Sequence, residues 1–336
     1  MSTRRRRPTI ADVARRAGVS AAAVSFAVND RPGVSPETRE RILEAARELG
    51  WRPSASARAL TEARTRAIGL VLAREPAQLE VDAFFVRFLS GIERTLAAAD
   101  YALLLQLVLP GTGGALGAYE RLAAAGRVDG FLLTDPELED PRFPLLERMG
   151  LPVVIAGHPA ADVPFQWIET EHQEGAAAAV EHLAGLGHAR IGFLGGPAHL
   201  EWVQRRRERF EEALRAAGLP AGPIAYVEDG EPAGAVLDSG ATAVVCSSDL
   251  LALALVAAAR ERGVDVPGDL SVSGFDDSPL AALSVPSLTS VRIDYAEFGA
   301  SAAALLLAAV AGEPAPAYRP SRPELATRAS TAAPRR

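Results

Sequence analysis

The sequence of 336 residues lacks features that define several classes of protein. Cys246 is its single cysteine, which excludes an internal disulfide framework and fits a reducing compartment. No apolar run approaches the roughly 18 residues of a membrane span, and the arginine-rich N-terminus lacks the apolar stretch of an export signal. We therefore expect a cytoplasmic protein that neither spans a membrane nor is exported.

Motifs of catalysis and metal binding are also missing from the sequence. The glycines at 192–196 do not have the G-x-G-x-x-G spacing of a dinucleotide-binding loop, and no G-x-S-x-G nucleophile motif occurs. The five histidines show no metal-ligand spacing. Cys246 ends an apolar stretch, where a buried and unreactive thiol is expected. We therefore expect neither an enzyme nor a bound metal or cofactor.

Charge is distributed unevenly along the chain, and all 35 basic residues are arginine. Residues 1–66 contain fourteen arginines and seven acidic residues, whereas the rest of the chain contains 21 arginines and 35 acidic residues. The net charge of −7 therefore combines a basic N-terminal part with an acidic remainder. A basic part is the electrostatic footprint of phosphate contact, and the acidic remainder discourages non-specific binding to DNA.

The N-terminal part predicts short helices with strong end signals. Thr9 is a good N-cap, and Asp12 follows three residues later, where it can complete a capping box. Gly18 ends this helix, and Ser20 caps a second helix two residues further on. Helices joined by so short a turn cross steeply, as in a helix-turn-helix motif. In that motif the second helix presents its N-terminal residues to base edges in the major groove.

A third helix is expected after Ser35, with Pro36 at its first position and Gly50 at its end. Its apolar stripe, which includes Leu43, is expected to complete a three-helix core. Residues 53–60 form a proline-started, helix-prone run that is too short to be stable alone in water. We expect this run to become ordered only when something holds it.

From residue 67 onward, apolar strands alternate with amphipathic helices. The expected strands are 67–72, 101–108, 128–134, 151–156, 189–194, 224–227, 243–246 and 270–275, and the expected helices are 84–99, 115–125, 145–150, 173–186, 202–217, 250–262 and 295–311. Such alternation is typical of parallel sheets covered on both faces. We estimate about eleven strands in all, too many for one compact sheet. We therefore predict an α/β body of two Rossmann-like sheets with a cleft between them, preceded by an all-α module.

An ordered series of motifs resembles the lactose-repressor (LacI/GalR) family of bacterial transcription regulators, over residues 8 to about 331. The matching segments are 9–14, 17–20, 32–39, 52–53, 57–60, 181–183, 186–188, 195–197, 265–269, 273–277, 288–289, 323–325 and 328–331. The resemblance implies a homodimer whose two heads read the half-sites of a near-palindromic operator. It also implies a hinge helix in the minor groove and a small effector bound between two periplasmic-binding-protein-like subdomains.

The same resemblance predicts the division of the chain into domains. A helix-turn-helix head would span 1–52, a hinge helix and linker 53–66, an effector-binding and dimerisation domain 67–331, and a tail 332–336. Within the large domain, the N-subdomain would comprise about 67–168 plus 294–320, and the C-subdomain about 169–293 plus 321–331.

Ten residues are expected to contact DNA: Thr9, Ser20, Ala21, Ala22, Ser25, Phe26, Asn29, Ser35, Ala57 and Leu60. Leu60 stands where the family's hinge leucine enters a base step, although it could be an ordinary linker residue. Phe26 stands where many members carry arginine, so a bidentate contact to guanine is not possible there. Together with Ala21 and Ala22 it offers an apolar surface suited to a thymine methyl group or to the recognition of DNA shape. The alternative is that Phe26 belongs to the core of the head.

Six residues are expected to bind the effector: Phe84, Phe85, Trp202, Arg206, Ser248 and Asp276. Arg206 would supply a fork of donors and Asp276 would accept from hydroxyls, a pair suited to a polyhydroxylated ligand. Trp202 would cover apolar ligand surface one helical turn before Arg206. Asp276 and Asp277 could instead be a helix-cap pair, and Phe85 could instead be a core residue.

Several polar positions of the family are apolar or absent here, including Gly157 and Ile293, so we expect a pocket less polar than a typical sugar site. We predict a sequence-specific transcriptional regulator, a repressor whose operator affinity is changed by a sugar or sugar derivative. A response to a non-sugar metabolite is the alternative. A solute-binding protein or an enzyme is disfavoured. The expected partners are operator DNA, the effector and a second copy of the chain, in the cytoplasm and associated with the nucleoid.

Overall fold

The computed structural model describes residues 8–28, 31–51, 64–74, 82–109 and 113–335. The chain forms two compact units, Met1–Thr65 and Arg66–Arg336. No helix within these described ranges is long and apolar enough to cross a membrane.

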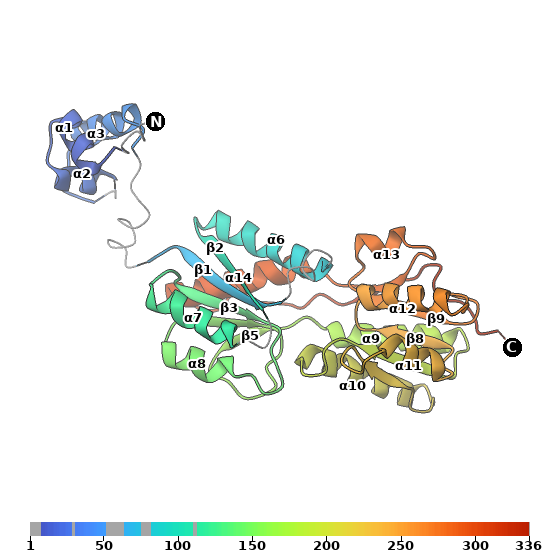
Figure 1. Cartoon of the computed structure of the whole chain (residues 1–336). Coiled ribbons are helices and arrows are strands. Elements are labelled where there is room, and N and C mark those ends of the chain that lie inside the picture. The colour runs from blue at the N-terminus through green and yellow to red at the C-terminus, as the bar shows by residue number, and fades with distance from the viewer. Residues whose placement is uncertain (1–7, 29–30, 52–63, 75–81, 110–112, 336) are drawn as a thin grey trace, which may run out of the picture. The chain divides into compact units, whose positions relative to one another are not determined.

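The described part of the first unit consists of three helices, α1 (Ile10–Ala17), α2 (Ala21–Val28) and α3 (Pro36–Glu48) (Figure 1). The predicted caps are confirmed. The Asp12 carboxylate accepts from the Thr9 backbone N–H at 2.9 Å, and Gly18 adopts a φ of 66° at the end of α1. The Ser20 hydroxyl accepts from the N–H of Ala23 at 3.1 Å, and Ser35 caps α3.

The core of the head is formed by apolar residues from all three helices. Val13, Val24 and Ile42 are completely buried at its centre. Leu43 does not belong to this core as predicted, because its side chain is 40% exposed on the outer face of α3. The predicted hinge run, 53–60, lies outside the described residues.

The second unit contains two sheets, which form two lobes. The first lobe holds a five-stranded parallel sheet in the order β2-β1-β3-β4-β5. Its strands are β1 (Ala67–Ala73), β2 (Ala102–Val108), β3 (Gly130–Thr134), β4 (Val153–Ala156) and β5 (Gln166–Ile168). Helices α6 (Ala83–Ala98) and α14 (Tyr295–Ala311) cover one face, and α7 (Gly114–Ala124) and α8 (Arg142–Met149) cover the other (Figure 1).

The second lobe holds a six-stranded sheet in the order β11-β10-β9-β8-β6-β7, in which only the pair β10–β11 is antiparallel. Its strands are β6 (Ile191–Gly195), β7 (Ile224–Tyr226), β8 (Ala243–Cys246), β9 (Ser271–Phe275), β10 (Thr289–Arg292) and β11 (Glu324–Ala326). Its helices are α9 (His172–Gly185), α10 (Glu201–Ala216), α11 (Pro232–Asp238), α12 (Asp249–Glu261) and α13 (Pro279–Leu283). Helices α9 and α10 pack on one face, and α11 and α12 pack on the other.

The side chains of β1 alternate between the two faces of the first sheet, and both faces are covered by helices. Ile68, Leu70 and Leu72 pack toward α6 and α14, whereas Val71 packs toward α7 and α8. A strand whose side chains are buried on both faces needs a continuous apolar sequence, as predicted. The prediction of two covered, mainly parallel sheets is therefore confirmed, although the short elements β5, β10, β11, α11 and α13 were not predicted.

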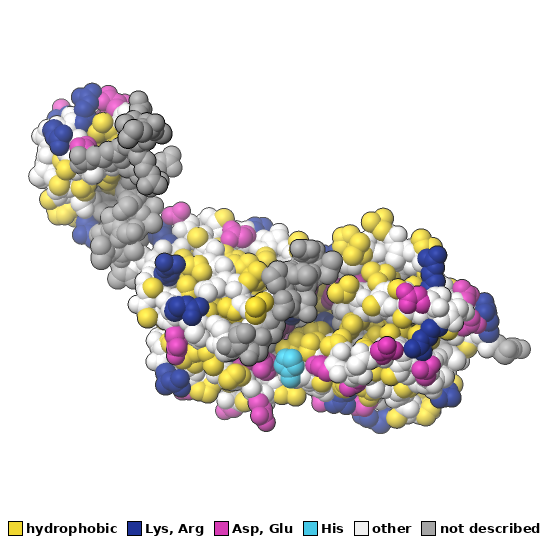
Figure 2. Space-filling model, viewed as in Figure 1, with side chains coloured by type: hydrophobic (Ala, Val, Ile, Leu, Met, Phe, Trp, Pro, Cys, Tyr) yellow, Lys and Arg dark blue, Asp and Glu magenta, His cyan; other side chains and the backbone are white. Residues whose placement is uncertain are grey.

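Helix α14 joins the two lobes in sequence, since it follows β10 of the second lobe and packs along α6 of the first. Glycines allow the two helices to approach closely. A Cβ atom at Gly91 would lie 1.9 Å from the carbonyl oxygen of Ala296, and one at Gly299 would lie 2.1 Å from that of Phe88. On the surface of the second unit that Figure 2 shows, arginine and acidic side chains are interspersed.

Candidate functional site

A cavity of about 330 Å³ lies between the two lobes of the second unit. It is lined by residues that directly follow strands β1, β3 and β4 of the first lobe and β6, β8 and β9 of the second. Because the carboxyl ends of parallel strands meet at one edge of a sheet, loops from both sheets converge here. This is the usual position of a ligand site in such folds.

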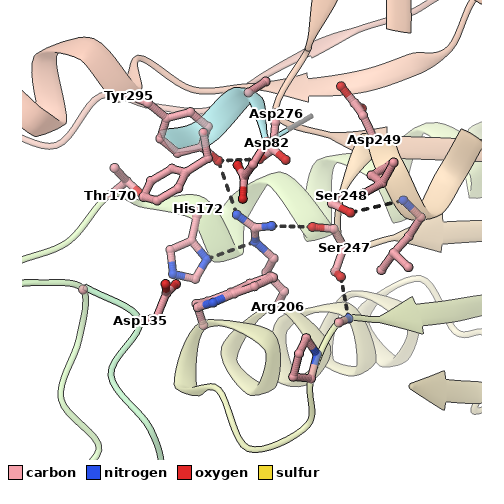
Figure 3. A pocket seen from close by; sticks show the side chains of 18 of the residues that line it. Asp82, Asp135, Thr170, His172, Arg206, Ser247, Ser248, Asp249, Asp276 and Tyr295 are labelled. Atoms are coloured by element: carbon pink, nitrogen blue, oxygen red, sulfur yellow. Dashed lines mark hydrogen bonds between the residues drawn. The ribbon is translucent and has the colours of Figure 1, made fainter. Parts of the chain in front are cut away.

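Arg206 on α10 is fixed at the centre of the cavity wall (Figure 3). Its Nη1 donates to the carbonyl oxygen of Ser247 at 2.5 Å, and its Nε donates to Nδ1 of His172 at 3.4 Å. Its guanidinium carbon lies 3.5 Å from the centre of the Phe275 ring and 4.7 Å from that of the Trp202 ring. Burial, together with Arg206, lowers the pKa of His172, so its neutral ring accepts the Nε hydrogen bond.

Asp276 follows β9 and adopts a φ of 98°, which turns the chain sharply at the cavity wall. Its carboxylate accepts from the hydroxyl of Tyr295 at 2.7 Å, and Nη2 of Arg206 donates to the same Tyr295 oxygen at 3.4 Å. Burial raises the pKa of Asp276 to about 6. The alternative that Asp276 is a helix cap is wrong, because Ser278 caps α13.

The first lobe contributes a second charged group to the cavity. Arg74 at the end of β1 lies 2.8 Å from the Asp135 carboxylate and 3.7 Å from that of Asp82. Asp82 is the N-cap of α6, and its carboxylate accepts from the N–H of Phe85 at 3.2 Å. Burial raises the pKa of Asp82 to about 6 despite the nearby Arg74.

Acidic residues also line the cavity where α10 begins. The side chain of Glu201 is 7% exposed, and its Oε1 lies 3.3 Å from Nδ1 of His158 and 3.6 Å from Nε of Arg205. Burial raises the pKa of Glu201 to about 7. Its second oxygen, Oε2, has no hydrogen-bond partner among the described residues. The Glu169 carboxylate lies 3.4 Å from Nη2 of the same Arg205.

The structure brings five of the six predicted effector residues to this cavity: Phe84, Trp202, Arg206, Ser248 and Asp276. Phe85 is not among its lining residues; its ring is 1% exposed and belongs to the core of the first lobe, as in the alternative reading. Ser248 serves as the N-cap of α12, where its hydroxyl accepts from Leu251.

Sequence reasoning missed most of the titratable residues of the cavity. The missed residues are Arg74, Asp82, Asp135, Glu169, His172, Glu201 and Asp249. For all of them except Glu169, which follows the unpredicted strand β5, the available signal was a position close to the end of an expected strand or the start of an expected helix. Among the described residues, no cluster of three or more side chains is arranged to hold a metal ion.

On α2 and its cap, the predicted DNA-contact residues form an outward-facing set. Ser20, Ala21 and Ala22 are exposed, and Ser25 is half-buried. Phe26 is 39% exposed and lies outside the core of the head, so the alternative of a core residue is wrong.

The remaining predicted contacts are divided between helix starts and the part of the chain that is not described. Thr9 and Ser35 begin α1 and α3, where the positive ends of helix dipoles favour phosphate. Asn29, Ala57 and Leu60 lie outside the described residues.

The chain joins three helices in a helix-turn-helix arrangement to a two-lobed body with a ligand-sized cavity. This combination defines a class of bacterial DNA-binding transcriptional regulators. Comparison with known proteins supports both parts. Residues 9–54 match the lacI family of bacterial regulatory proteins, and residues 180–331 match a periplasmic binding protein-like domain. The regulator MalR of Streptomyces coelicolor is 36% identical over 341 residues, covering 96% of each chain.

Two solved structures have the same fold over the length of the chain. The CelR–cellobiose complex aligns with a TM-score of 0.70 and 30% identity, over 96% of this chain and 100% of that one. The lac repressor dimer bound to operator and the anti-inducer ONPF aligns with a TM-score of 0.84 and 25% identity, over 98% and 100%. The chain therefore belongs to the LacI family. MalR, CelR and the lac repressor are transcriptional regulators, not enzymes.

Proposed function

We propose that the protein is a transcriptional repressor that binds its operator as a homodimer in the cytoplasm, at the nucleoid, and that a sugar or sugar derivative changes its operator affinity. The arrangement around Arg206 is the observation that carries this proposal. Its guanidinium is held against two aromatic rings beside the carboxylate of Asp276. Donors, a carboxylate acceptor and an aromatic face suit the hydroxyls and C–H surface of a sugar. The cellobiose in the CelR complex supports the same ligand class.

The effector acts through its position between the lobes. Arg206 and Ser248 belong to the second lobe, whereas Phe84 and Asp82 belong to the first, so a bound ligand contacts both. A ligand that prefers one arrangement of the lobes shifts their equilibrium, and such coupling is typically about 1–3 kcal/mol. In the repressor dimer this shift changes the spacing of the two hinge segments and hence operator affinity.

In this proposal α2 reads base edges in the major groove through Ala21, Ala22, Ser25 and Phe26, with Ser20 at its start. Thr9 and Ser35 contact phosphates. Contacts from Asn29 and Ala57, and insertion of Leu60 into the minor groove, complete the interface. Because two half-sites are bound by linked heads, the dimer gains effective concentration for its second contact.

The proposal is tested by isolating duplexes that the full-length protein selects from a random pool, and then measuring their affinity by fluorescence anisotropy across a panel of sugars. A sugar-dependent change in affinity supports the proposal, and a response only to non-sugar metabolites contradicts the sugar class. The fragment 66–336, which is a compact unit with its own cores, serves as the control. It should bind the sugar and not the duplex; equal affinity for the duplex would overturn the division of roles.

A further inference from the structure

The cavity carries an excess of negative charge that the sugar proposal alone does not explain. Six carboxylates line it: Asp82, Asp135, Glu169, Glu201, Asp249 and Asp276. Two guanidinium groups, those of Arg74 and Arg206, line it as well. Arg205 is not a lining residue, but its guanidinium lies 3.4 Å from Glu169 and 3.6 Å from Glu201, so the carboxylates still outnumber the nearby cations. His172 adds no charge at neutral pH, because burial lowers its pKa.

The two guanidinium groups differ in their partners, because Arg74 is paired with carboxylates and Arg206 donates to uncharged groups. Arg74 is ion-paired with Asp135 at 2.8 Å and lies 3.7 Å from Asp82. Arg206 donates to Ser247, His172 and Tyr295 and stacks on Phe275. An anionic group of a ligand would therefore have to compete with Asp135 and Asp82 for Arg74, the one of the two cations that belongs to the same lobe as Asp82.

Asp82 is the carboxylate for which this excess of negative charge has the largest consequence. It lies at the start of α6 in the first lobe, next to Asp276 of the second lobe (Figure 3). Burial is the main cause of its raised pKa; Arg74 lowers this pKa, whereas the charges of Asp276 and Asp135 raise it further. Two like carboxylates that face each other across the lobes are stabilised by a ligand that donates hydrogen bonds to both.

Glu201 is an independent sign that the cavity wall prefers donors. Its side chain is 7% exposed, and its Oε2 atom finds no donor among the described residues. A buried acceptor of this kind is costly unless a donor reaches it. A ligand hydroxyl can supply that donor, whereas an ionised phosphate or carboxylate group at the same place brings only acceptors.

We propose that Asp82 makes the cavity selective for an uncharged, hydroxyl-rich effector, so that a phosphorylated or carboxylated form of the same sugar is rejected. This inference rests on the proposed sugar response. The sugar hydroxyls donate to Asp82 and Asp276 and so bridge the two lobes. A phosphate ester in the same place meets both carboxylates, and such like-charge contact weakens binding strongly.

The test is calorimetric titration of the full-length protein with four neutral disaccharides, cellobiose, maltose, trehalose and sucrose, each paired with its 6-phosphate ester. In the wild type, we expect the neutral member of the binding pair to bind at least about tenfold more tightly. In Asp82→Asn this preference should fall about tenfold or more. Asparagine caps a helix as well as aspartate does, so α6 keeps its cap while the charge is lost.

Asp100→Asn is the matched control, because Asp100 lies in the same lobe with a side chain that is 74% exposed. Its preference for the neutral sugar should equal that of the wild type. An ester that binds the wild type as tightly as its parent sugar, or a preference unchanged in Asp82→Asn, overturns the inference while the sugar response stands. If neither member of any pair binds, both the sugar response and the inference fail.

Discussion

The guanidinium carbon of Arg206 lies 3.5 Å from the centre of the Phe275 ring. Cation–π contact of this kind is strong where water is excluded, and Arg206 is 6% exposed. With Nη1 also held by the carbonyl of Ser247, the fork is fixed before a ligand arrives. A group fixed in advance loses little freedom on binding, so its contacts contribute fully to affinity.

Replacing Arg206 with lysine should abolish this advantage while keeping the positive charge. Lysine has neither the planar group that stacks on Phe275 nor the fork that donates to several partners. We expect Arg206→Lys to weaken sugar binding at least about tenfold, with operator affinity unchanged in the absence of sugar. Calorimetry and anisotropy measure the two affinities. Arg215→Lys, at an exposed position of the same helix, is the control. Wild-type sugar affinity in Arg206→Lys would contradict the role proposed here.

The contrast between Arg206 and Asp82 shows what the sequence could predict of the site. Arg206 and Asp276 were predicted as site residues from the resemblance and from expected strands and helices. Asp82 can be recognised as a site residue only from the fold, which brings the ends of β1, β3 and β9 together. Phe84 and Phe85 illustrate another limit. Neighbouring residues of a helix point about 100° apart, and periodicity alone did not decide which of the two faces the cavity.

Short strands with polar residues were the main omission in the fold. Strand β10 contains Thr289 and Ser290, both buried by packing in the sheet, and spans four residues. Nothing local distinguishes such a segment from a loop, because its burial comes from its neighbours β9 and β11. Long apolar strands such as β1 carry their own signal and were predicted.

Glu201 should make the stability of the second unit depend on pH. Burial raises its pKa from 4.5 to about 7 in the folded state, so the folded protein holds this proton more tightly than the unfolded chain does. The contribution of Glu201 to the free energy of unfolding therefore falls by roughly 3 kcal/mol as the pH rises from about 4.5 to about 7. Glutamine does not titrate, so the free energy of unfolding of Glu201→Gln should rise by that amount relative to the wild type as the pH increases over this range.

Urea unfolding of both proteins at a series of pH values measures this difference, and comparing them removes contributions shared with His158 and the other titrating groups. Glu208→Gln changes a residue of the same helix whose side chain is 60% exposed, and its stability should follow that of the wild type at every pH. A pH-independent difference between Glu201→Gln and the wild type would show that Glu201 keeps an ordinary pKa.

The capping box at the start of α1 should control the stability of the head. The Thr9 side chain accepts from the N–H of Asp12, so Thr9→Ala leaves that N–H without its cap and should cost about 1 kcal/mol. Thr9→Ser keeps the hydroxyl and should retain most of the stability. Amide hydrogen exchange of α1 in the full-length protein measures the effect. Equal exchange in the alanine and serine variants would mean that the cap contributes nothing.

Phe26 should set base preference rather than hold the head together. Its side chain is 39% exposed and lies beside Ala22 on the outer face of α2, so Phe26→Ala removes apolar surface with little loss of core packing. An apolar side chain favours the methyl group of thymine, which is one of the few apolar features of the major groove. Selection of duplexes from a random pool should show a relaxed preference at one position of each half-site. Leu43→Ala removes a side chain of similar exposure from α3 and should leave the selected sequence unchanged. Unchanged selectivity in Phe26→Ala would mean that the preference comes from other residues.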